Sequence, residues 1–192
     1  MNTSKPNLAF IDVETTGLDP SKHEIIDIGV VLVDSETRLV LSSANFKTTP
    51  ERIDDADPIA LKVNGYTKED WADAISLKDA LTRVAEITRG AYLMAYNVSF
   101  DYSFLQAAFQ KTGVRDTMRY QRLDVLTLAW LLLPDQDSLS LKNVCIALDI
   151  EPEPEIHTAE NGALKAFEVY SALMTKHKAT IEDAWKYGEL QH

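Results

Sequence analysis

The chain has 192 residues, of which 45% are hydrophobic and 26% are charged. This composition can bury one sizeable core and is too small for two ordinary domains, so we expect residues 1–192 to form a single domain. The formal net charge of -11 comes from 30 acidic against 19 basic residues. Such a surface repels a polyanion, which argues against broad, sequence-independent coating of a nucleic-acid duplex.

The N-terminal segment has one lysine and no apolar signal-like run, and the longest apolar stretch, LTLAWLLL, is too short to cross a bilayer. We therefore expect a cytoplasmic protein without membrane contact. The single cysteine, Cys145, excludes an internal disulfide. It lies in a helix-like pattern, which favours a small buried residue.

The first part of the chain predicts a β-meander followed by helices. Strands are expected at residues 8–14, 24–34 and 38–47, which are β-rich and separated by turn residues. A short helix within residues 55–74 ends near Asn64 and Gly65, and a second helix spans residues 76–90, with Ser76 as its cap.

The rest of the chain alternates strands and helices. Strands are expected at residues 91–96 and 118–125, and helices at residues 99–113, 126–134, 140–150 and 159–177. Prolines keep the acidic linker at residues 151–155 from being helical throughout. This order favours an α/β fold with a mixed β-sheet flanked by helices.

Two carboxylates lie two positions apart on the first predicted strand. Asp12 and Glu14 in FIDVETTGL therefore project from the same face. Neighbouring carboxylates are costly unless a cation lies between them, and a hard divalent ion, Mg²⁺ or Mn²⁺, fits oxygen ligands. An exposed strand end also tolerates acids, so the pair alone is weak evidence of a metal site.

Two further polar residues follow the strand at residues 91–96. Asp101 in AYNVSFDYSFL lies in the first turn of a helix, where the helix dipole favours an acid for structural reasons alone. Asn97 fits a turn or cap position equally well. A strand end followed by a helix start is, however, where α/β sheets gather ligands.

His157 lies between the acidic linker and the last long helix. A lone exposed histidine is usually not functional. Beside a metal-bound phosphodiester, however, histidine is the natural general base, because it titrates near neutral pH and the linker allows it to move.

Four basic residues fall within a dozen positions: Lys111, Arg115, Arg119 and Arg122. A solvated helix face is the simpler interpretation, and a patch that steers phosphate is the alternative.

Three ordered motifs give the chain a resemblance to the DEDDh 3'-5' exonucleases. This branch of the RNase H-like fold includes the proofreading subunit of bacterial DNA polymerase III and RNase T. The matching motifs are FIDVETTGLDP, AYNVSFDYSFL and HTAENGAL. The resemblance covers residues 8–175 in the expected order, which leaves residues 176–192 as a C-terminal extension.

The resemblance implies an RNase H-like mixed sheet and a metal-dependent enzyme. It makes Asp12 a ligand of both metal ions, Glu14 a ligand of the first and Asp101 a ligand of the second. The two ions are Mg²⁺ or Mn²⁺, and His157 deprotonates the attacking water. The residues expected against the terminal nucleotide are Thr15, Thr16, Leu18, Asn97 and Phe100, with Phe100 or Tyr102 available for base stacking. The implied product is a nucleoside 5'-monophosphate released from a 3' end.

The third motif departs from the family at one position. The family has an aspartate five residues after His157, and this chain has Gly162. On a helix, Glu160 and Asn161 point away from the face of residue 162, so neither is a neighbouring replacement. Glycine costs roughly 0.5 to 1 kcal/mol in a helix interior relative to alanine, and the sequence pattern does not call for a bend. We expect metal binding and activity to be impaired.

The alternative functions are a catalytically inactive nucleic-acid-binding relative and a polymerase-associated subunit. The last helix, with Trp185 and Tyr187, is the candidate docking face for the second alternative, although packing explains these aromatics more simply. The expected partners are single-stranded DNA or RNA 3' ends, with a polymerase assembly or a homodimer also open. The choice between DNA and RNA depends on contacts to the 2'-hydroxyl, which no motif residue determines.

Overall fold

A five-stranded mixed sheet forms the centre of the computed structural model, which describes residues 5–189 of the backbone and side chains as far as residue 178. The strands are β1 (Leu8–Thr15), β2 (Ile25–Val33), β3 (Val40–Lys47), β4 (Tyr92–Ala95) and β5 (Arg122–Asp124), in the spatial order β3-β2-β1-β4-β5. The meander β1-β2-β3 is antiparallel, whereas β4 and β5 join parallel to β1. The predicted mixed sheet is therefore confirmed.

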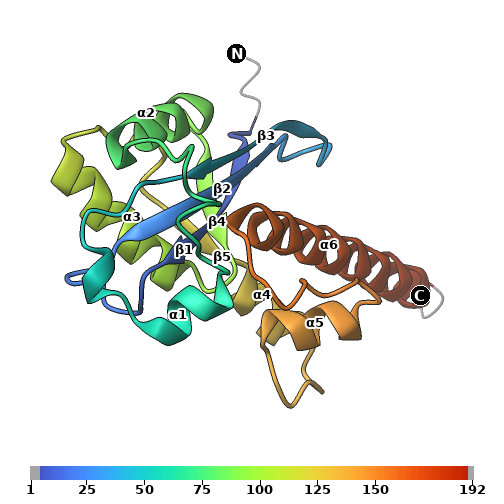
Figure 1. Cartoon of the computed structure of the whole chain (residues 1–192). Helices are drawn as coiled ribbons and strands as arrows, with labels where there is room; N and C mark the ends of the chain where they lie inside the picture. The colour runs from blue at the N-terminus through green and yellow to red at the C-terminus, as the bar shows by residue number, and fades with distance from the viewer. Residues whose placement is uncertain (1–4, 190–192) are drawn as a thin grey trace.

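Helices cover both faces of this sheet, as Figure 1 shows, with α2 and α3 on one side and α4, α5 and α6 on the other. The helices are α1 (Pro58–Val63), α2 (Leu77–Ile87), α3 (Val98–Thr112), α4 (Val125–Leu132), α5 (Leu141–Ala147) and α6 (Ala159–Glu189), with a 3-10 turn η1 (Ile53–Asp55) before α1. The helix α6 runs twelve residues beyond the predicted end at residue 177. Among the described residues, no helix is long and apolar enough to span a membrane.

The side chains of β1 alternate between the two cores. Ile11 and Val13 belong to the core under α2 and α3, and Phe10 belongs to the core under α4 and α6. Because strand side chains alternate with a period of two, Asp12 and Glu14 follow Phe10 onto the α6 face. Cys145 is fully buried in the same core, as predicted.

The first turn of α6 rests on β2 through two residues of that strand. The carboxylate of Asp27 accepts a hydrogen bond from the backbone N–H of Ala159, at 3.3 Å. A Cβ added to Gly29 would lie 1.9 Å from the backbone oxygen of Ala159, so only glycine allows this approach. Together these contacts fix the start of α6 over the strands that carry the predicted site.

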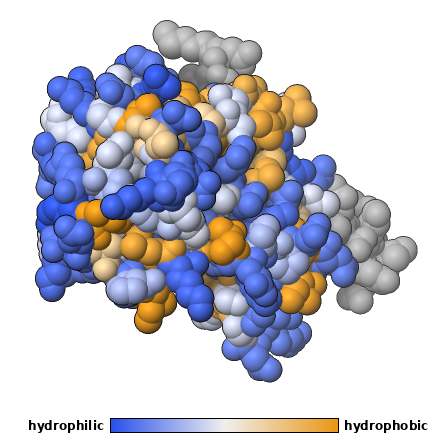
Figure 2. Space-filling model, in the orientation of Figure 1, coloured by the Kyte–Doolittle hydropathy of each residue, from blue (hydrophilic) through white to orange (hydrophobic). Residues whose placement is uncertain are grey.

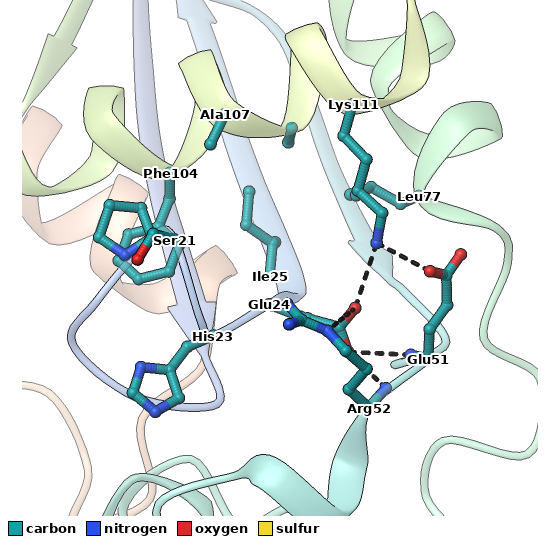
Figure 3. Close-up of a pocket in the computed structure, with 12 residues that line it drawn as sticks. Ser21, His23, Glu24, Ile25, Glu51, Arg52, Leu77, Phe104, Ala107 and Lys111 are labelled. Atoms are coloured by element: carbon teal, nitrogen blue, oxygen red, sulfur yellow. Dashed lines mark hydrogen bonds and ion pairs between the residues drawn. The ribbon is translucent and has the colours of Figure 1, made fainter.

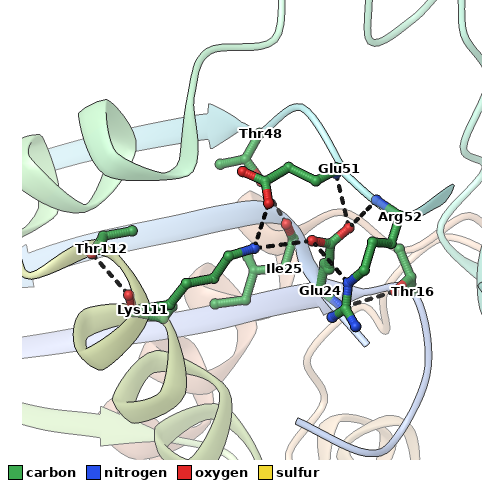
Figure 4. A network of polar contacts seen from close by, with 9 residues as sticks. Thr16, Glu24, Ile25, Thr48, Glu51, Arg52, Lys111 and Thr112 are labelled. Carbon is green, nitrogen blue, oxygen red and sulfur yellow. Dashed lines mark hydrogen bonds and ion pairs between the residues drawn. The ribbon is translucent and has the colours of Figure 1, made fainter. Parts of the chain in front are cut away.

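A buried carboxylate holds the loop that follows β1. Glu24 accepts hydrogen bonds from the backbone N–H groups of Glu51 and Arg52, at 2.9 and 2.8 Å. Its other oxygen lies 3.2 Å from Nζ of Lys111 on α3 (Figure 4). Because a buried charge needs such partners, Glu24 fastens the loop to both neighbouring segments.

Exposed apolar side chains occur at the β2-β3 hairpin, where Leu39, Val40 and Leu41 are each at least half exposed. Apolar surface gathers at the upper right of Figure 2, over this hairpin and the start of β3. The predicted docking residues Trp185 and Tyr187 lie outside the residues whose side chains are described.

Candidate active site

Asp12 and Glu14 stand side by side near the end of β1 and are half-buried on the α6 face. Within the described part of the chain, no group donates a hydrogen bond to either carboxylate. Their oxygens therefore keep all of their lone pairs for another ligand.

Asp101 is brought to the same place by the start of α3. Its side chain is 2% exposed, and its Oδ1 accepts a hydrogen bond from the backbone N–H of Val13, at 3.2 Å. The contact joins residues that are 88 positions apart and draws Asp101 against the strand of Asp12 and Glu14.

Burial and mutual repulsion both disfavour the ionised forms of these carboxylates. Burial raises the pKa of Asp12 well above its usual range, and the charges of Asp101 and Glu14 raise it further. Burial likewise raises the pKa of Glu14 to about 7 and that of Asp101 to about 8, although the Val13 N–H opposes the shift at Asp101. The charge of Glu14 thus disfavours ionisation of both Asp12 and Asp101, a repulsion that a bound cation would offset.

Two further carboxylates act on this group, and sequence reasoning missed both. The charges of Glu153 and Asp27 raise the pKa of Asp12 and also that of Glu14. The pairing of Glu14 with Asp27 across the β1-β2 ladder was implied by the meander. The approach of Glu153 depends on the path of an irregular linker, which no sequence period reveals.

Gly162 lies directly against Asp12. A Cβ added to Gly162 would lie 2.5 Å from Cγ and Oδ2 of Asp12. The glycine has a packing reason that the sequence pattern did not disclose, because any side chain here would require the Asp12 carboxylate to turn. The position is also where an aspartate would point at the carboxylate group, as the third motif implies.

His157 is exposed at the start of α6. Its backbone N–H donates a hydrogen bond to the carbonyl of Val63 at the end of α1, at 3.0 Å. Burial raises the pKa of Glu153, and the charge of His157 opposes that shift, which indicates that the imidazole lies near that carboxylate. The described residues provide no hydrogen bond to the ring.

The residues expected against a terminal nucleotide divide into two groups. Thr15 and Thr16 are buried, and their hydroxyl groups are engaged with Gly17 and Glu24 inside the loop. As placed, these two side chains do not face a ligand. Leu18, by contrast, is 79% exposed.

Asn97 and Phe100 lie at the beginning of α3. Asn97 is exposed with a left-handed backbone (φ 67°) and makes no side-chain cap. Asp124 instead caps the start of α3 by accepting hydrogen bonds from the backbone N–H groups of Asn97 and Val98. Phe100 is half-buried, with its ring centroid 5.1 Å from that of Phe104.

The donor chemistry of the site fits divalent metal ions, since hard cations prefer carboxylate oxygens. As placed, however, no three His, Cys, Asp or Glu side chains among those described lie close enough to hold an ion. The carboxylates of Asp12, Glu14 and Asp101 must therefore turn toward one another to share one.

The basic residues 111–122 mostly serve the fold. Lys111 pairs with Glu24 and Glu51, and Arg122 pairs with Asp116 at 2.8 Å. Arg119 donates to the carbonyl of Gly90. These contacts favour a structural role over a phosphate-steering patch.

A hollow of about 380 Å³ lies on the α3 side of the sheet, away from Asp12 and Glu14. Figure 3 shows Glu24, Arg52 and Lys111 along its wall, with His23 at one end. Because Glu24 and Glu51 already pair with both of its cations, the hollow offers little net attraction for a phosphate.

Comparison with protein families gives a match that covers most of the chain. The RNase_T family model, described as an exonuclease, matches residues 9–170. The chain is 30% identical over 182 residues to the DNA polymerase III subunit epsilon of Salmonella typhimurium, covering 90% of this chain and 73% of that protein. It is also 28% identical over 150 residues to the PolC-type DNA polymerase III of Mycoplasmopsis pulmonis. The chain spans only 10% of the length of that polymerase.

Solved structures share the fold. Exonuclease I of E. coli in complex with a dT13 oligonucleotide superposes with a TM-score of 0.76 at 19% identity, over 94% of this chain and 44% of that one. A 3'-exonuclease in a structure of specific 3'-end recognition of a histone mRNA stem-loop superposes with a TM-score of 0.74 at 15% identity, over 91% and 84%. The predicted RNase H-like architecture is thus confirmed by neighbours of the same fold.

Proposed function

Because the chain belongs to the RNase_T family of exonucleases and carries three DEDDh-type motifs, we propose that it is a metal-dependent 3'-5' exonuclease. Its substrate would be a single-stranded nucleic-acid end, and its product a nucleoside 5'-monophosphate. The observation that carries the proposal is the hydrogen bond from the Val13 N–H to Asp101, which holds the start of α3 against the strand of Asp12 and Glu14.

Exonucleases of this kind use divalent metals, and this chain has suitable carboxylates for them. Asp12 would contact both ions, Glu14 the first and Asp101 the second. Bound Mg²⁺ or Mn²⁺ would supply an activated water and would stabilise the leaving 3' oxygen. Holding the ions would also offset the mutual repulsion of the carboxylates.

The other site residues would act on the water and the strand. The exposed imidazole of His157 would take the proton of the attacking water. Leu18 would lie against the terminal base, with Asn97 and Phe100 at the mouth of the site. The buried hydroxyl groups of Thr15 and Thr16 would shape the loop that presents Leu18.

Gly162 favours a second candidate, a binding module that holds a 3' end without cleaving it. One ligand position lacks a carboxylate, while Leu18 and Phe100 remain available to a nucleotide. Such a module would retain affinity for a strand and would not release mononucleotides.

The names of the relatives support wider proposals about the protein's setting. Since the epsilon and PolC relatives are DNA polymerase III proteins, we propose a polymerase assembly as a partner, with a homodimer as the alternative. Residues 1–192 would act as one exonuclease domain, in which residues 176–192 extend the family region.

The test is digestion of one oligonucleotide labelled at its 5' end or at its 3' end, in Mn²⁺. A 3'-5' exonuclease shortens the 5'-labelled strand progressively and releases the 3' label as a mononucleotide at once. The control is Asp101→Asn, whose side-chain oxygen can still accept the Val13 N–H. It should be at least roughly 100-fold slower, because a lost metal ligand forfeits several kcal/mol of transition-state stabilisation. A strand that is bound and stays intact with either label, with the parent chain and with Gly162→Asp alike, contradicts the proposal and favours the binding module.

A further inference from the structure

The helix α1 connects the strand that carries two of the carboxylates with the segment that carries the proposed base. At its start, the backbone N–H of Asp57 donates a hydrogen bond to the Thr16 carbonyl, at 2.7 Å. Just past its end, the side chain of Asn64 donates a hydrogen bond to the Thr15 carbonyl, at 3.1 Å. Both ends of α1 are therefore fastened to the two residues that directly follow Glu14.

The same end of α1 holds the backbone of His157. The Val63 carbonyl accepts a hydrogen bond from the His157 N–H, at 3.0 Å. Gly65 has a left-handed backbone (φ 63°), and a Cβ on it would lie 2.7 Å from a methyl group of Ile156. Because Gly65 has no side chain, Ile156 packs directly on the turn after α1. Asn64 lies between Val63 and Gly65, so one turn contacts both β1 and the segment before α6.

The other side of His157 is fixed to β2. The Ala159 N–H donates a hydrogen bond to the Asp27 carboxylate, at 3.3 Å, and β2 pairs with β1. These contacts form a closed ring that runs from β1 through α1, His157 and the start of α6 to β2, and so back to β1. In this ring the Asn64 side chain holds the end of α1 on Thr15. Without it, the end of α1 can move away from β1, and the His157 backbone can move with it.

Asn64 is placed to hold a fixed geometry. The residue is only 3% exposed, and both ends of its amide are engaged, Nδ2 by the Thr15 carbonyl and Oδ1 by the Tyr66 N–H, at 3.3 Å. Because an unsatisfied buried amide is costly, these bonds hold their partners in one arrangement. Within the described part of the chain, Asn64 makes no hydrogen bond to the three carboxylates of the site.

We propose that Asn64 is a positioning residue for His157: by holding the end of α1 on β1, it sets the distance between the imidazole and the carboxylates of Asp12 and Glu14. A general base needs such control, because a displacement of about 1 Å can lower a rate roughly 100-fold. The imidazole is exposed, so the contacts of its backbone provide the restraint. This inference rests on the proposed exonuclease function and adds a residue outside the three sequence motifs.

Amide hydrogen exchange of the full chain tests the contact without any reaction. Asn64→Ala should raise the exchange rate of the His157 N–H at least about tenfold, because its acceptor on Val63 is no longer held in place. The matched control is Thr88→Val, which removes another buried hydrogen bond, from the Thr88 hydroxyl to the Val84 carbonyl at the end of α2. It should leave the exchange of the His157 N–H within about twofold of the parent chain. An unchanged exchange rate in Asn64→Ala, or an equal increase in both variants, would overturn the inference.

A double-mutant cycle of digestion rates distinguishes positioning from a general loss of structure. Rates are measured in Mn²⁺ on the 5'-labelled strand, in whichever of the parent chain and Gly162→Asp digests it faster. Asn64→Ala should slow digestion roughly 10- to 100-fold when His157 is present, and less than about twofold when His157→Ala has already removed the base. Thr88→Val should slow digestion less than about twofold in both backgrounds.

Calorimetry of Mn²⁺ binding shows whether Asn64 acts through His157 or through the carboxylates. Asn64 is uncharged, so Asn64→Ala should change the Mn²⁺ affinity less than about twofold. A loss of affinity as large as the loss of rate would mean that Asn64 acts on the metal site, and equal slowing with and without His157 would mean that it does not act through the base. Either result would overturn the inference.

The remaining outcomes separate this inference from the proposed function. If His157→Ala leaves the rate of digestion unchanged, the role of Asn64 fails together with that of His157, while the exonuclease function stands. If neither the parent chain nor Gly162→Asp digests the strand, the exonuclease function itself fails, and the inference fails with it.

Discussion

Gly162 packs so closely against Asp12 that a Cβ on the glycine would lie 2.5 Å from the Asp12 carboxylate carbon. The contact joins the first turn of α6 to the centre of the acid cluster. It means that position 162 both limits the space around Asp12 and decides whether a carboxylate faces the site.

His157→Ala tests the proposed general base. The side chain is exposed and has no hydrogen-bond partner among the described residues, while the bond to Val63 comes from its backbone. We expect the free energy of unfolding to change by less than about 0.5 kcal/mol. The rate of digestion should fall by roughly 10² to 10⁴, measured in Mn²⁺ on a 5'-labelled strand. An unchanged rate would remove His157 from the mechanism.

The acid cluster should give the protein an unusual pH dependence in EDTA. Burial raises the pKa of Glu14 to about 7 and that of Asp101 to about 8, so the folded state binds more protons than the unfolded chain above their ordinary values near 4. Stability should therefore fall as the pH rises from about 4 to about 8. Urea unfolding at a series of pH values measures this slope.

The matched variant for that slope is Asp101→Asn, which has no proton to lose and should flatten the decline. Mn²⁺ should weaken or reverse it in the parent chain, because a bound cation favours the ionised carboxylates. A stability that instead rises with pH across this window in EDTA would contradict the electrostatic description of the cluster.

Gly29→Ala tests the close packing of the start of α6 against β2. A Cβ at this position would lie 1.9 Å from the backbone oxygen of Ala159, and backbone cannot yield as a side chain can. We expect a loss of roughly 1 to 3 kcal/mol in the free energy of unfolding, together with weaker Mn²⁺ binding, since Gly162 moves with the helix. Ser43→Ala, at an exposed position of the neighbouring strand β3, should leave both quantities unchanged. An unchanged free energy of unfolding in Gly29→Ala would show that α6 does not pack this closely against β2.

Glu24→Gln tests the network that holds the loop after β1. The change removes the charge that pairs with Lys111 and Arg52 and weakens the bonds from two backbone N–H groups. Because both cations are about half exposed and can rehydrate, we expect a loss of roughly 1.5 to 3 kcal/mol in the free energy of unfolding. Glu86→Gln, at an exposed position of α2, serves as the control. An equal loss of stability in both variants would show that the Glu24 network does not stabilise the loop.

Much of the framework follows from local patterns in the sequence. The alternation in FIDVE placed Asp12 and Glu14 on one strand face, and the turn after β4 placed Asp101 at the start of α3, as the structure has them. The end of α1 at Asn64 and the Ser76 cap of α2 could also be predicted, because helix caps depend on adjacent residues.

Contacts between distant segments escaped sequence reasoning. The burial of Thr15 and Thr16 depends on how the loop that contains Glu24 folds back over them. Glu24 in turn pairs with Lys111, which is 87 positions away in the sequence. The effect of the Glu153 charge on Asp12 depends on a linker with prolines and no period, which contacts α1 through the His157 N–H and the Val63 carbonyl. Such relationships arise from tertiary packing, for which one sequence carries no periodic signal.

The most direct measurement is Mn²⁺-dependent digestion of a 5'-labelled single-stranded oligonucleotide by the parent chain and by Gly162→Asp, side by side. A metal-dependent exonuclease with a weakened first site predicts that Gly162→Asp shortens the strand from its 3' end at least about tenfold faster, after the Asp12 carboxylate turns to admit the new side chain. If neither chain shortens the strand, or if Gly162→Asp is the slower of the two, this account of the acid cluster is wrong.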